Sequence, residues 1–440
     1  MKRRTLLTGA AALAVARPTF AATPTSILFW HSMNGQLGDV LATLVNRFNK
    51  SQSTVVVNAV FKGGYAEALT AAIAAWRAGQ APHIAQVFDV GTATMIAAGP
   101  AVKYASDLFK ETGVPLDPNH YIEAVRGYYS LPDGGMGSMP FNSSTAVLWY
   151  NTDAFKKAGL DPEKPPATWP ELVAAAKVIK EKKVSQYVMT TSWPTWIHFE
   201  QFSAIHNVAY ATDEDGFKGL GARLLVDSEP FVENLQNLLD MSKDGTFKYA
   251  GRDNIPDPVF YSGQAAMAFN SSASRGALVK TAKFPFANTF LPYWPDIIKK
   301  PINSIIGGAS LWTMTAPHRT AAEYKGVAEF LSFLGEPRQD ADWASSTGYV
   351  PVTFAGSDLL DKEGYYAKNP GTKLPVEQLE RKPVTDNSRG IRLGNMPEIR
   401  VIIEEEWEKE LAGGFDAKSA LTRAVARGNK VLAAFQSSAG

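Results

Sequence analysis

Polar and aromatic residues follow three short apolar segments near the start of the sequence. Residues 26–30, 54–60 and 84–88 each have the apolar character of a buried strand, and residues at helical spacing separate them. This alternation predicts a parallel sheet, whose ligands bind beyond the carboxyl ends of the strands. Tyr65 and Asp89 lie at such ends. A buried aspartate is costly unless it is paired, which favours Asp89 as an acceptor for ligand hydroxyl groups.

A second group of residues has the chemistry to bind an anion. Residues 270–274 (NSSAS) precede an apparent helix near Arg275, and a helix start offers free N–H groups. Capping of that helix by serine explains the same pattern equally well. Gly308, in a Gly-Gly pair, allows backbone N–H groups to approach an anion or simply forms a tight turn. Arg392 precedes another helix start, although a lone arginine more often forms a surface ion pair.

The sequence contains no motif of a common enzyme or metal site. It has no cysteine, no His-Glu-x-x-His pair, no P-loop, no calcium loop and no Gly-x-Ser-x-Gly elbow, and its six histidines are scattered. We therefore expect a protein that is not an enzyme, with no catalytic residue, metal or cofactor. Residues distant in sequence can still build a catalytic group, so an enzyme stays an alternative.

The composition is that of a folded chain of two ordinary domains. It has 440 residues, of which 45% are hydrophobic and 20% charged. Beyond residue 22 no segment is apolar for the length that a bilayer requires, which predicts a soluble chain. Without the four basic residues of the first 22, 40 basic residues face 43 acidic ones, a net charge of about −3. That balance argues against nucleic acid or an anionic membrane as partner.

The first 22 residues have the pattern of a cleavable export signal. Lys2, Arg3 and Arg4 precede an apolar run over residues 6–15, and small residues follow at 21–22. The arginine pair resembles a twin-arginine signal. Because no cysteine is present to carry a lipid, we expect an untethered protein of the periplasm.

Later segments indicate a second unit and a helical C-terminal part. From about Pro140 onward, the sequence predicts a strand over 145–150, a helix over 152–158 closed by Gly159, and a capping box of Thr168 and Glu171. Residues 285–301 have the composition of an irregular crossover. A helix with Ile399, Ile402, Ile403, Trp407 and Leu411 on one face follows, and its acidic residues 404–410 are expected to be solvated.

Several segments carry a resemblance to a known family. Residues 140–162 (PFNSSTAVLWYNTDAFKKAGLDP) and 165–169 (PPATW) resemble the segment where solute-binding proteins of ABC importers cross between lobes. Five others, spread in order over nearly the whole chain, are similar to the members that serve glycerol-phosphate importers: 29–33 (FWHSM), 86–95 (QVFDVGTATM), 306–312 (IGGASLW), 347–351 (TGYVP) and 392–400 (RLGNMPEIR).

The resemblance implies an α/β fold of the two-lobed periplasmic-binding-protein type (type II). Each lobe would be a sheet flanked by helices, with the ligand cleft between them. The expected division is residues 1–22 as signal peptide, 23–139 and 272–323 as the first lobe, and 140–271 and 324–440 as the second. The partners implied are a small ligand of the glycerol-phosphate class and the transmembrane subunits of an ABC importer, and the chain itself is expected to be a monomer.

The resemblance also implies a set of ligand contacts. They are Tyr65, Asp89, Ser144, Trp193, Ser271, Gly308, Tyr349 and Arg392. Trp196, Ser272 and Ser274 are neighbours that would contribute. Arg392, Ser271 and Gly308 would bind the phosphate, and Asp89 the hydroxyl groups. Related proteins carry glutamate where this chain has Asp89, which leaves a monoester or a diester open. The aromatic walls could hold the cation of a glycerophosphodiester such as glycerophosphocholine, which is a second candidate ligand. A sugar or oligosaccharide is the first alternative, and a secreted phosphodiester hydrolase is the second.

Overall fold

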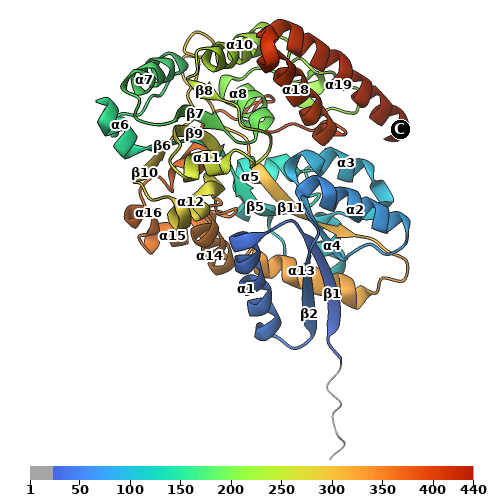
Figure 1. Cartoon of the computed structure of the whole chain (residues 1–440). Helices are drawn as coiled ribbons and strands as arrows, with labels where there is room; N and C mark the ends of the chain where they lie inside the picture. The colour runs from blue at the N-terminus through green and yellow to red at the C-terminus, as the bar shows by residue number, and fades with distance from the viewer. Residues whose placement is uncertain (1–22, 440) are drawn as a thin grey trace, which may run out of the picture.

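The computed structural model describes residues 23–439, so the expected signal peptide lies outside the described residues. Two separate sheets organise these residues, and each forms the centre of one lobe (Figure 1). This is the two-lobed α/β architecture that the sequence predicted. Within residues 23–439, no helix combines the length and the apolar character needed to cross a membrane.

The sheet of the first lobe has the strand order β2-β1-β3-β11-β4, and β5 pairs with the free part of β11. β1 is parallel to β2 and β3, whereas β11 is antiparallel to β3. The strands are β1 (Thr25–His31), β2 (Val55–Phe61), β3 (Ile84–Phe88), β4 (Val102–Lys103), β5 (Met139–Ser144) and β11 (Gly307–Met314). Every residue of β3 is buried, including Gln86, as its mainly apolar character predicted.

The sheet of the second lobe has the order β10-β6-β9-β7-β8. Its strands are β6 (Ala146–Asn151), β7 (Tyr187–Thr191), β8 (Phe247–Lys248), β9 (Ala265–Ser271) and β10 (Phe286–Thr289). β6 runs antiparallel to both of its neighbours, and β7 runs parallel to β9. The crossover expected over 285–301 therefore contains an edge strand, β10, at its start.

Helices cover both sheets (Figure 1). Those before β6 are α1 (Gly35–Ser51), α2 (Tyr65–Arg77), α3 (Thr92–Ala97), α4 (Ala105–Thr112) and α5 (Glu123–Tyr129). Those between β6 and β11 are α6 (Thr152–Ala158), α7 (Trp169–Lys182), α8 (Phe202–His206), α9 (Thr212–Asp215), α10 (Glu229–Lys243), α11 (Asp257–Tyr261) and α12 (Arg275–Thr281). After β11 come α13 (Ala321–Leu334), α14 (Pro337–Thr347), α15 (Phe354–Lys362), α16 (Tyr365–Lys368), α17 (Leu374–Leu379), α18 (Met396–Lys409) and α19 (Ala417–Ala439).

Short helical turns complete the fold, and two of them are π-helical, with a wider winding than an α-helix. The 3₁₀ turns are η1 (Asp89–Gly91), η2 (Gly99–Ala101), η3 (Pro118–His120) and η5 (Ser272–Ser274). The π-helical turns are η4 (Trp196–Gln201) and η6 (Glu410–Gly414). π-helical turns are rare and often occur at functional sites. The turn η4 contributes Trp196 to the cleft described below.

The lobes are discontinuous in sequence, and the division differs in detail from the predicted one. β5 was expected to begin the second lobe but lies in the first sheet. β10 falls in the range expected for the first lobe but pairs with β6 of the second sheet. α13 packs against β1 and α4 of the first lobe, although most of it was assigned to the second. Crossover segments cannot be assigned to a sheet from their own sequence, because pairing partners are distant in the chain.

The segments that cross between the lobes meet at Thr145. This residue joins β5 of the first sheet to β6 of the second. Its hydroxyl lies 2.7 Å from Ser304 Oγ, in the segment between β10 and β11. It also accepts a hydrogen bond of 3.1 Å from Gln378 Nε2, and the same amide donates to Ala146 O at 2.8 Å. Buried polar side chains thus tie three crossing segments together at one point.

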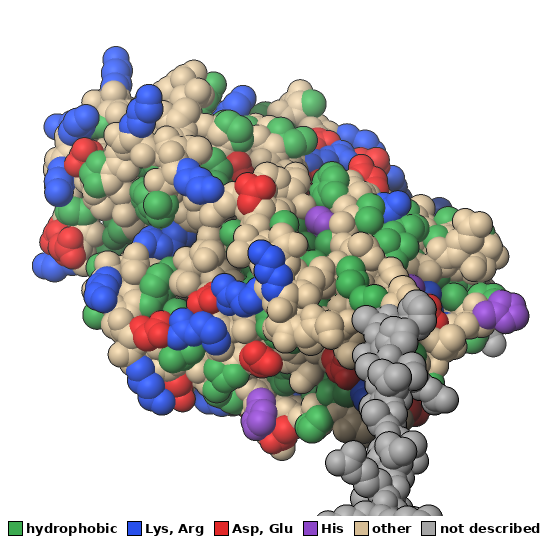
Figure 2. Space-filling view, turned by 90° about the horizontal axis from the view of Figure 1, so that it is seen from below, with side chains coloured by type: hydrophobic (Ala, Val, Ile, Leu, Met, Phe, Trp, Pro, Cys, Tyr) green, Lys and Arg blue, Asp and Glu red, His purple; other side chains and the backbone are tan. Residues whose placement is uncertain are grey.

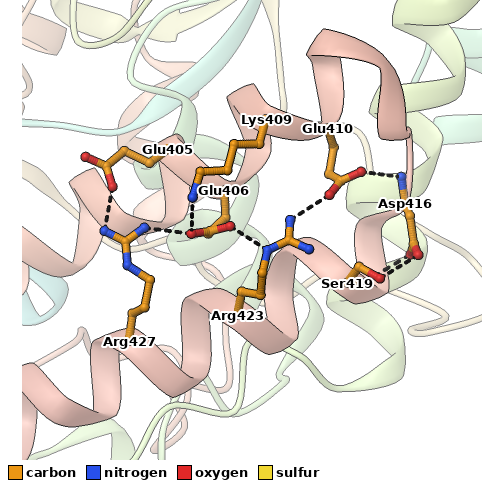
Figure 3. A network of polar contacts seen from close by, with 8 residues as sticks. All are labelled: Glu405, Glu406, Lys409, Glu410, Asp416, Ser419, Arg423 and Arg427. Atoms are coloured by element: carbon orange, nitrogen blue, oxygen red, sulfur yellow. Dashed lines mark hydrogen bonds and ion pairs between the residues drawn. The ribbon is translucent and has the colours of Figure 1, made fainter.

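The acidic residues of α18 differ from the expectation of a solvated surface. The side chains of Glu406 and Glu410 are only 1% and 9% exposed. Arg423 of α19 bonds both carboxylates, at 2.7 and 2.6 Å, and Arg427 bonds Glu406 at 2.6 Å (Figure 3). The charges are complementary across two helices that are adjacent in space. Charge counting along α18 alone could not reveal these partners on α19.

Candidate functional site

A cavity of about 300 Å³ lies between the two lobes. The first lobe contributes the start of α1, the start of α2 and the residues after β3. The second lobe contributes the loop after β7, the helix α11 and the end of β9. The lining of the cavity includes seven of the eight predicted contacts: Tyr65, Asp89, Ser144, Trp193, Ser271, Gly308 and Tyr349. Of the predicted neighbours, Trp196 and Ser274 also line it.

Asp89 lies directly after β3 and is 3% exposed. Its Oδ2 lies 3.3 Å from Nη2 of Arg400, in α18 of the second lobe. Burial raises the pKa of Asp89 to about 7, Arg400 lowers it, and the carboxylate of Glu200 raises it further. The ion pair between Asp89 and Arg400 therefore spans the cleft from lobe to lobe.

Two tyrosines form part of the cleft wall. The ring of Tyr65 stacks on Phe88, with 5.4 Å between centroids, and its hydroxyl accepts a hydrogen bond of 2.9 Å from Asn142 Nδ2. The ring of Tyr349 stacks on Trp343 at 5.8 Å. Stacking fixes both rings, so each presents an aromatic surface and a polar hydroxyl at a defined place.

Ser271 is the last residue of β9, and it both caps the following turn η5 and lines the cleft. Its Oγ accepts a hydrogen bond of 3.1 Å from the N–H of Ala273, at the start of η5. The capping role that the sequence left open is therefore present. Ser272 lies behind it, where its Oγ accepts from the N–H of Thr145 at 3.4 Å.

The Gly307-Gly308 pair allows close packing at the base of the cleft. Gly308 has a φ of +110°, and a Cβ at this position would lie 1.9 Å from the carbonyl oxygen of Asn142. A Cβ on Gly307 would lie 2.4 Å from the ring of Trp196. Both glycines are thus required by their surroundings, and Trp196 packs directly on the first of them.

Trp193 differs from Trp196 in its backbone. Its φ is +49°, an uncommon value for a bulky residue. Its N–H donates a hydrogen bond of 2.7 Å to the carbonyl oxygen of Asp253, whose φ is +47°. Trp196 is 4% exposed, whereas Trp193 is only half-buried. Of the two tryptophans, Trp193 is the one whose side chain retains more exposed surface.

Arg392 does not line the cleft. Its Nη2 donates to the carbonyl oxygens of Tyr128 and Ser130, at 2.9 and 2.6 Å, and its guanidinium lies 3.9 Å over the ring of Phe217. Burial lowers the pKa of Arg392 to about 10. These carbonyls belong to the last turn of α5 and its C-cap, so Arg392 satisfies acceptors at a helix end. The structure differs from the sequence prediction at this position.

The arginine in the lining of the cleft is Arg400, whereas the sequence pointed to Arg392. Its Nε and Nη2 donate to the two carboxylate oxygens of Glu200, at 2.6 and 2.7 Å. Burial tends to lower the pKa of Arg400, but Glu200 and Asp89 raise it, so the guanidinium stays charged. The sequence held a signal for this residue, because Arg400 falls at helical spacing among the buried Met396, Ile403 and Trp407.

Charged groups in the cleft lining are few. They are Asp89, Asp257 and Arg400. Asp257 accepts hydrogen bonds from Ser192 Oγ at 2.5 Å, Asn270 Nδ2 at 2.8 Å and Tyr261 Oη at 3.0 Å. The cleft therefore combines one arginine with carboxylates, amides, hydroxyls and aromatic rings. Such a set suits a small ligand with an anionic group and several hydroxyl groups.

The outer surface carries charges of both signs. Figure 2 shows acidic and basic side chains scattered among hydrophobic ones on one face of the molecule. Within residues 23–439, no group of three or more histidine, aspartate or glutamate side chains is arranged to hold a metal ion.

Comparison with known proteins gives consistent results. Residues 34–341 match the family described as bacterial extracellular solute-binding protein. The sn-glycerol-3-phosphate-binding periplasmic protein UgpB of Brucella abortus is 43% identical over 98% of each chain. UgpB of Pectobacterium atrosepticum is also 43% identical, over 99% of this chain and 98% of its own.

Two solved structures share the fold. UgpB of Mycobacterium tuberculosis in complex with glycerophosphocholine has a TM-score of 0.78, with 22% identity over 94% of this chain and all of that one. The cyclic α-maltosyl-1,6-maltose binding protein of Arthrobacter globiformis has a TM-score of 0.73, with 24% identity over 93% of this chain and 99% of that one. The family match, the extent of identity and the shared architecture agree, and the chain belongs to the bacterial extracellular solute-binding proteins.

Proposed function

We propose that this protein is the periplasmic component of an ABC importer that binds sn-glycerol 3-phosphate and glycerophosphodiesters such as glycerophosphocholine. The observation that carries the proposal is the interlobe cleft, where Arg400 faces a set of hydroxyl, amide and carboxyl groups. The UgpB relatives, 43% identical over nearly the full length, support the same ligand class. The protein would act as a monomer and deliver its ligand to the transmembrane subunits of the importer.

Arg400 is the proposed partner of the phosphate. Its guanidinium is the only cationic side chain in the lining of the cavity formed by residues 23–439. Ser271, Ser274 and the backbone at Gly308 would donate further hydrogen bonds. Asp89 and Tyr65 would bind the glycerol hydroxyls, Trp193 would cover the glycerol carbons, and Ser144 and Tyr349 would complete the wall.

The charge balance favours a diester over a monoester. Two carboxyl groups, Asp89 and Asp257, line the cleft with a single arginine. A phosphate monoester approaches two negative charges near neutral pH, whereas a diester carries one. The cationic head of glycerophosphocholine would in addition be attracted by aromatic rings such as those of Trp193 and Tyr261, both in the cleft lining.

Tryptophan fluorescence provides the test, because Trp193 and Trp196 line the cleft. The purified protein would be titrated with sn-glycerol 3-phosphate, glycerophosphocholine, maltose and inorganic phosphate. We expect saturable changes with the first two ligands and tighter binding of the diester. A response to maltose alone would identify a sugar-binding protein, and release of product from glycerophosphocholine would identify a hydrolase.

A further inference from the structure

Glu200 lies behind Arg400, and its side chain is fully buried. It belongs to the π-helical turn η4, whereas Arg400 lies on α18, 200 residues later. The two side chains form a bidentate pair, Nε to Oε1 at 2.6 Å and Nη2 to Oε2 at 2.7 Å. Paired N–H groups bonded to one carboxylate fix the plane of a guanidinium as well as its position.

The donors of Arg400 divide into two groups. A guanidinium has five N–H groups. Glu200 takes one from Nε and one from Nη2, and Asp89 accepts the second from Nη2 at 3.3 Å. Within residues 23–439, Nη1 makes no hydrogen bond, which leaves both of its N–H groups for a ligand in the cleft that Arg400 lines.

We propose that Glu200 is a positioning residue for ligand binding, which holds Arg400 so that the two N–H groups of Nη1 face the ligand. The proposal rests on the proposed function, in which Arg400 binds the phosphate. Glu200 itself does not line the cleft and would act only through Arg400.

The turn η4 is suited to this role because its neighbours hold it firmly. Gln201 Nε2 donates a hydrogen bond of 2.8 Å to the carbonyl oxygen of Ile305, in the segment that leads to β11. Asn234 Nδ2 donates to the carbonyl oxygen of His198 at 2.9 Å. Trp196 packs against Gly307. A carboxylate on a fixed backbone can restrain a long arginine side chain that would otherwise lose rotamer entropy on binding.

Positioning and charge compensation predict opposite results. Together with Asp89, Glu200 places two carboxyl groups on one guanidinium, so a purely electrostatic role would weaken attraction for an anion. Removal of its charge would then tighten binding. If Glu200 positions Arg400, its removal weakens binding, because the guanidinium can rotate away from the ligand.

Two variants test the proposal, Glu200→Gln and Glu200→Asp. The first removes the charge and replaces one acceptor by a donor, and the second keeps the charge but shortens the side chain. By isothermal titration calorimetry with glycerophosphocholine and sn-glycerol 3-phosphate, we expect the Kd to rise at least about tenfold for Glu200→Gln, the scale of one lost charge-assisted pair. For Glu200→Asp we expect a smaller rise.

Glu406→Gln is the matched control, because Glu406 is also buried and also bonds arginines, but on the side of α18 that faces α19 (Figure 3). It should lower the Tm and leave the Kd within about twofold, since it does not touch the cleft. An unchanged or lower Kd for Glu200→Gln, or a Kd for Glu200→Asp equal to that of the wild type, would overturn the proposal.

A ligand-free measurement separates this proposal from the proposed function. In ¹H–¹⁵N spectra of the unliganded protein, the Nε–H of Arg400 should exchange slowly with water, and Arg400→Lys would assign its signal. We expect Glu200→Gln to abolish that protection. An unaltered signal would contradict positioning, whereas absence of wild-type binding to both glycerophosphates would contradict the proposed function alone.

Discussion

Two arginines of similar burial have different hydrogen-bond partners. Arg392 and Arg400 are each 9% exposed. Arg392 donates two hydrogen bonds to backbone carbonyls at the end of α5, which are neutral acceptors. These two bonds hold parts of the fold together. Arg400 bonds two carboxyl groups, and among the described residues its Nη1 has no hydrogen-bond partner. Residue type and the position near a helix start therefore could not distinguish them.

Matched substitutions separate these two roles. Arg→Lys keeps the charge at either position but removes the planar fork of donors. For Arg400→Lys, we expect the Kd for glycerophosphocholine to rise at least about tenfold. For Arg392→Lys, we expect a Kd within about twofold of the wild type and a lower Tm, because a helix end loses a hydrogen bond. Calorimetric titration and thermal unfolding measure both effects.

A large loss of affinity in Arg392→Lys, with Arg400→Lys unaffected, would instead support the phosphate contact expected from the sequence. Seven of the eight expected contacts line the cleft. The family resemblance implied all eight, and for Tyr65 and Asp89 the ends of apolar segments independently indicated the same edge of the sheet. Arg392, the eighth, lies outside the lining, and Arg400 lies in it. The pair of Arg400 with Glu200 could not be foreseen from the sequence, because it joins residues 200 positions apart.

At the scale of elements, the turn after α8 holds a buried acid in an unusual backbone. α9 (Thr212–Asp215) has positive φ values at Asp213, Glu214 and Asp215, of 56°, 53° and 54°. Asp215 is fully buried, and its Oδ1 accepts hydrogen bonds of 2.9 and 2.7 Å from the N–H groups of Tyr210 and Ala211. Burial raises the pKa of Asp215 to about 7, although these hydrogen bonds lower it.

This raised pKa makes the stability contribution of Asp215 dependent on pH. In the unfolded chain the group releases its proton near pH 4, whereas the folded protein keeps it to about pH 7. Its contribution is therefore fully present below about pH 4 and is lost as the pH rises through 7. Asp215→Asn keeps the acceptor and removes the ionisation. We expect the Tm of this variant, relative to the wild type, to increase from pH 5.5 to 8.5.

Asp416→Asn is the control for this comparison. Hydrogen bonds from Ser419 lower the pKa of Asp416, so the group is ionised in both states throughout that pH range. Its effect on the Tm should be constant with pH. A difference between Asp215→Asn and the wild type that does not change with pH would show that Asp215 is ionised in the folded protein.

The elements that could be predicted are those with a local cause. β1 and β3 follow from apolar runs, and α6 ends at Gly159, whose φ is +82°. α7 begins with the expected capping box, in which the N–H of Thr168 donates to Glu171 Oε2 at 3.0 Å. β10 and the burial of Glu406 were missed because each depends on a distant partner, β6 and α19 respectively.

At the scale of the molecule, two lobes meet at a cleft and are joined by few segments. The Asp89–Arg400 pair connects the lobes inside the cleft, and Arg392 connects them outside it, from Phe217 to the end of α5. The crossing segments converge on Thr145, where side-chain hydrogen bonds hold them together. Such an arrangement permits bending about one region while each sheet stays rigid.

Ligand binding should therefore change the overall dimensions of the protein. Contacts from both lobes stabilise a closed form, so we expect the radius of gyration from small-angle X-ray scattering to decrease when glycerophosphocholine is added. Arg400→Lys at the same ligand concentration should show a smaller decrease, because less ligand is bound. Identical scattering curves for the free and the saturated wild type would exclude closure in solution.

The place of β11 in the first sheet has a consequence for the order of folding. β11 lies between β3 and β4, yet it follows β3 by more than two hundred residues, and the whole second sheet lies between them in the chain. The first lobe cannot complete its sheet until residues 307–314 have been synthesised. Long-range pairing of this kind slows folding. A chain that stops at residue 300 would contain every strand of the second sheet but would leave the first one open along β3, exposed to pairing with other chains.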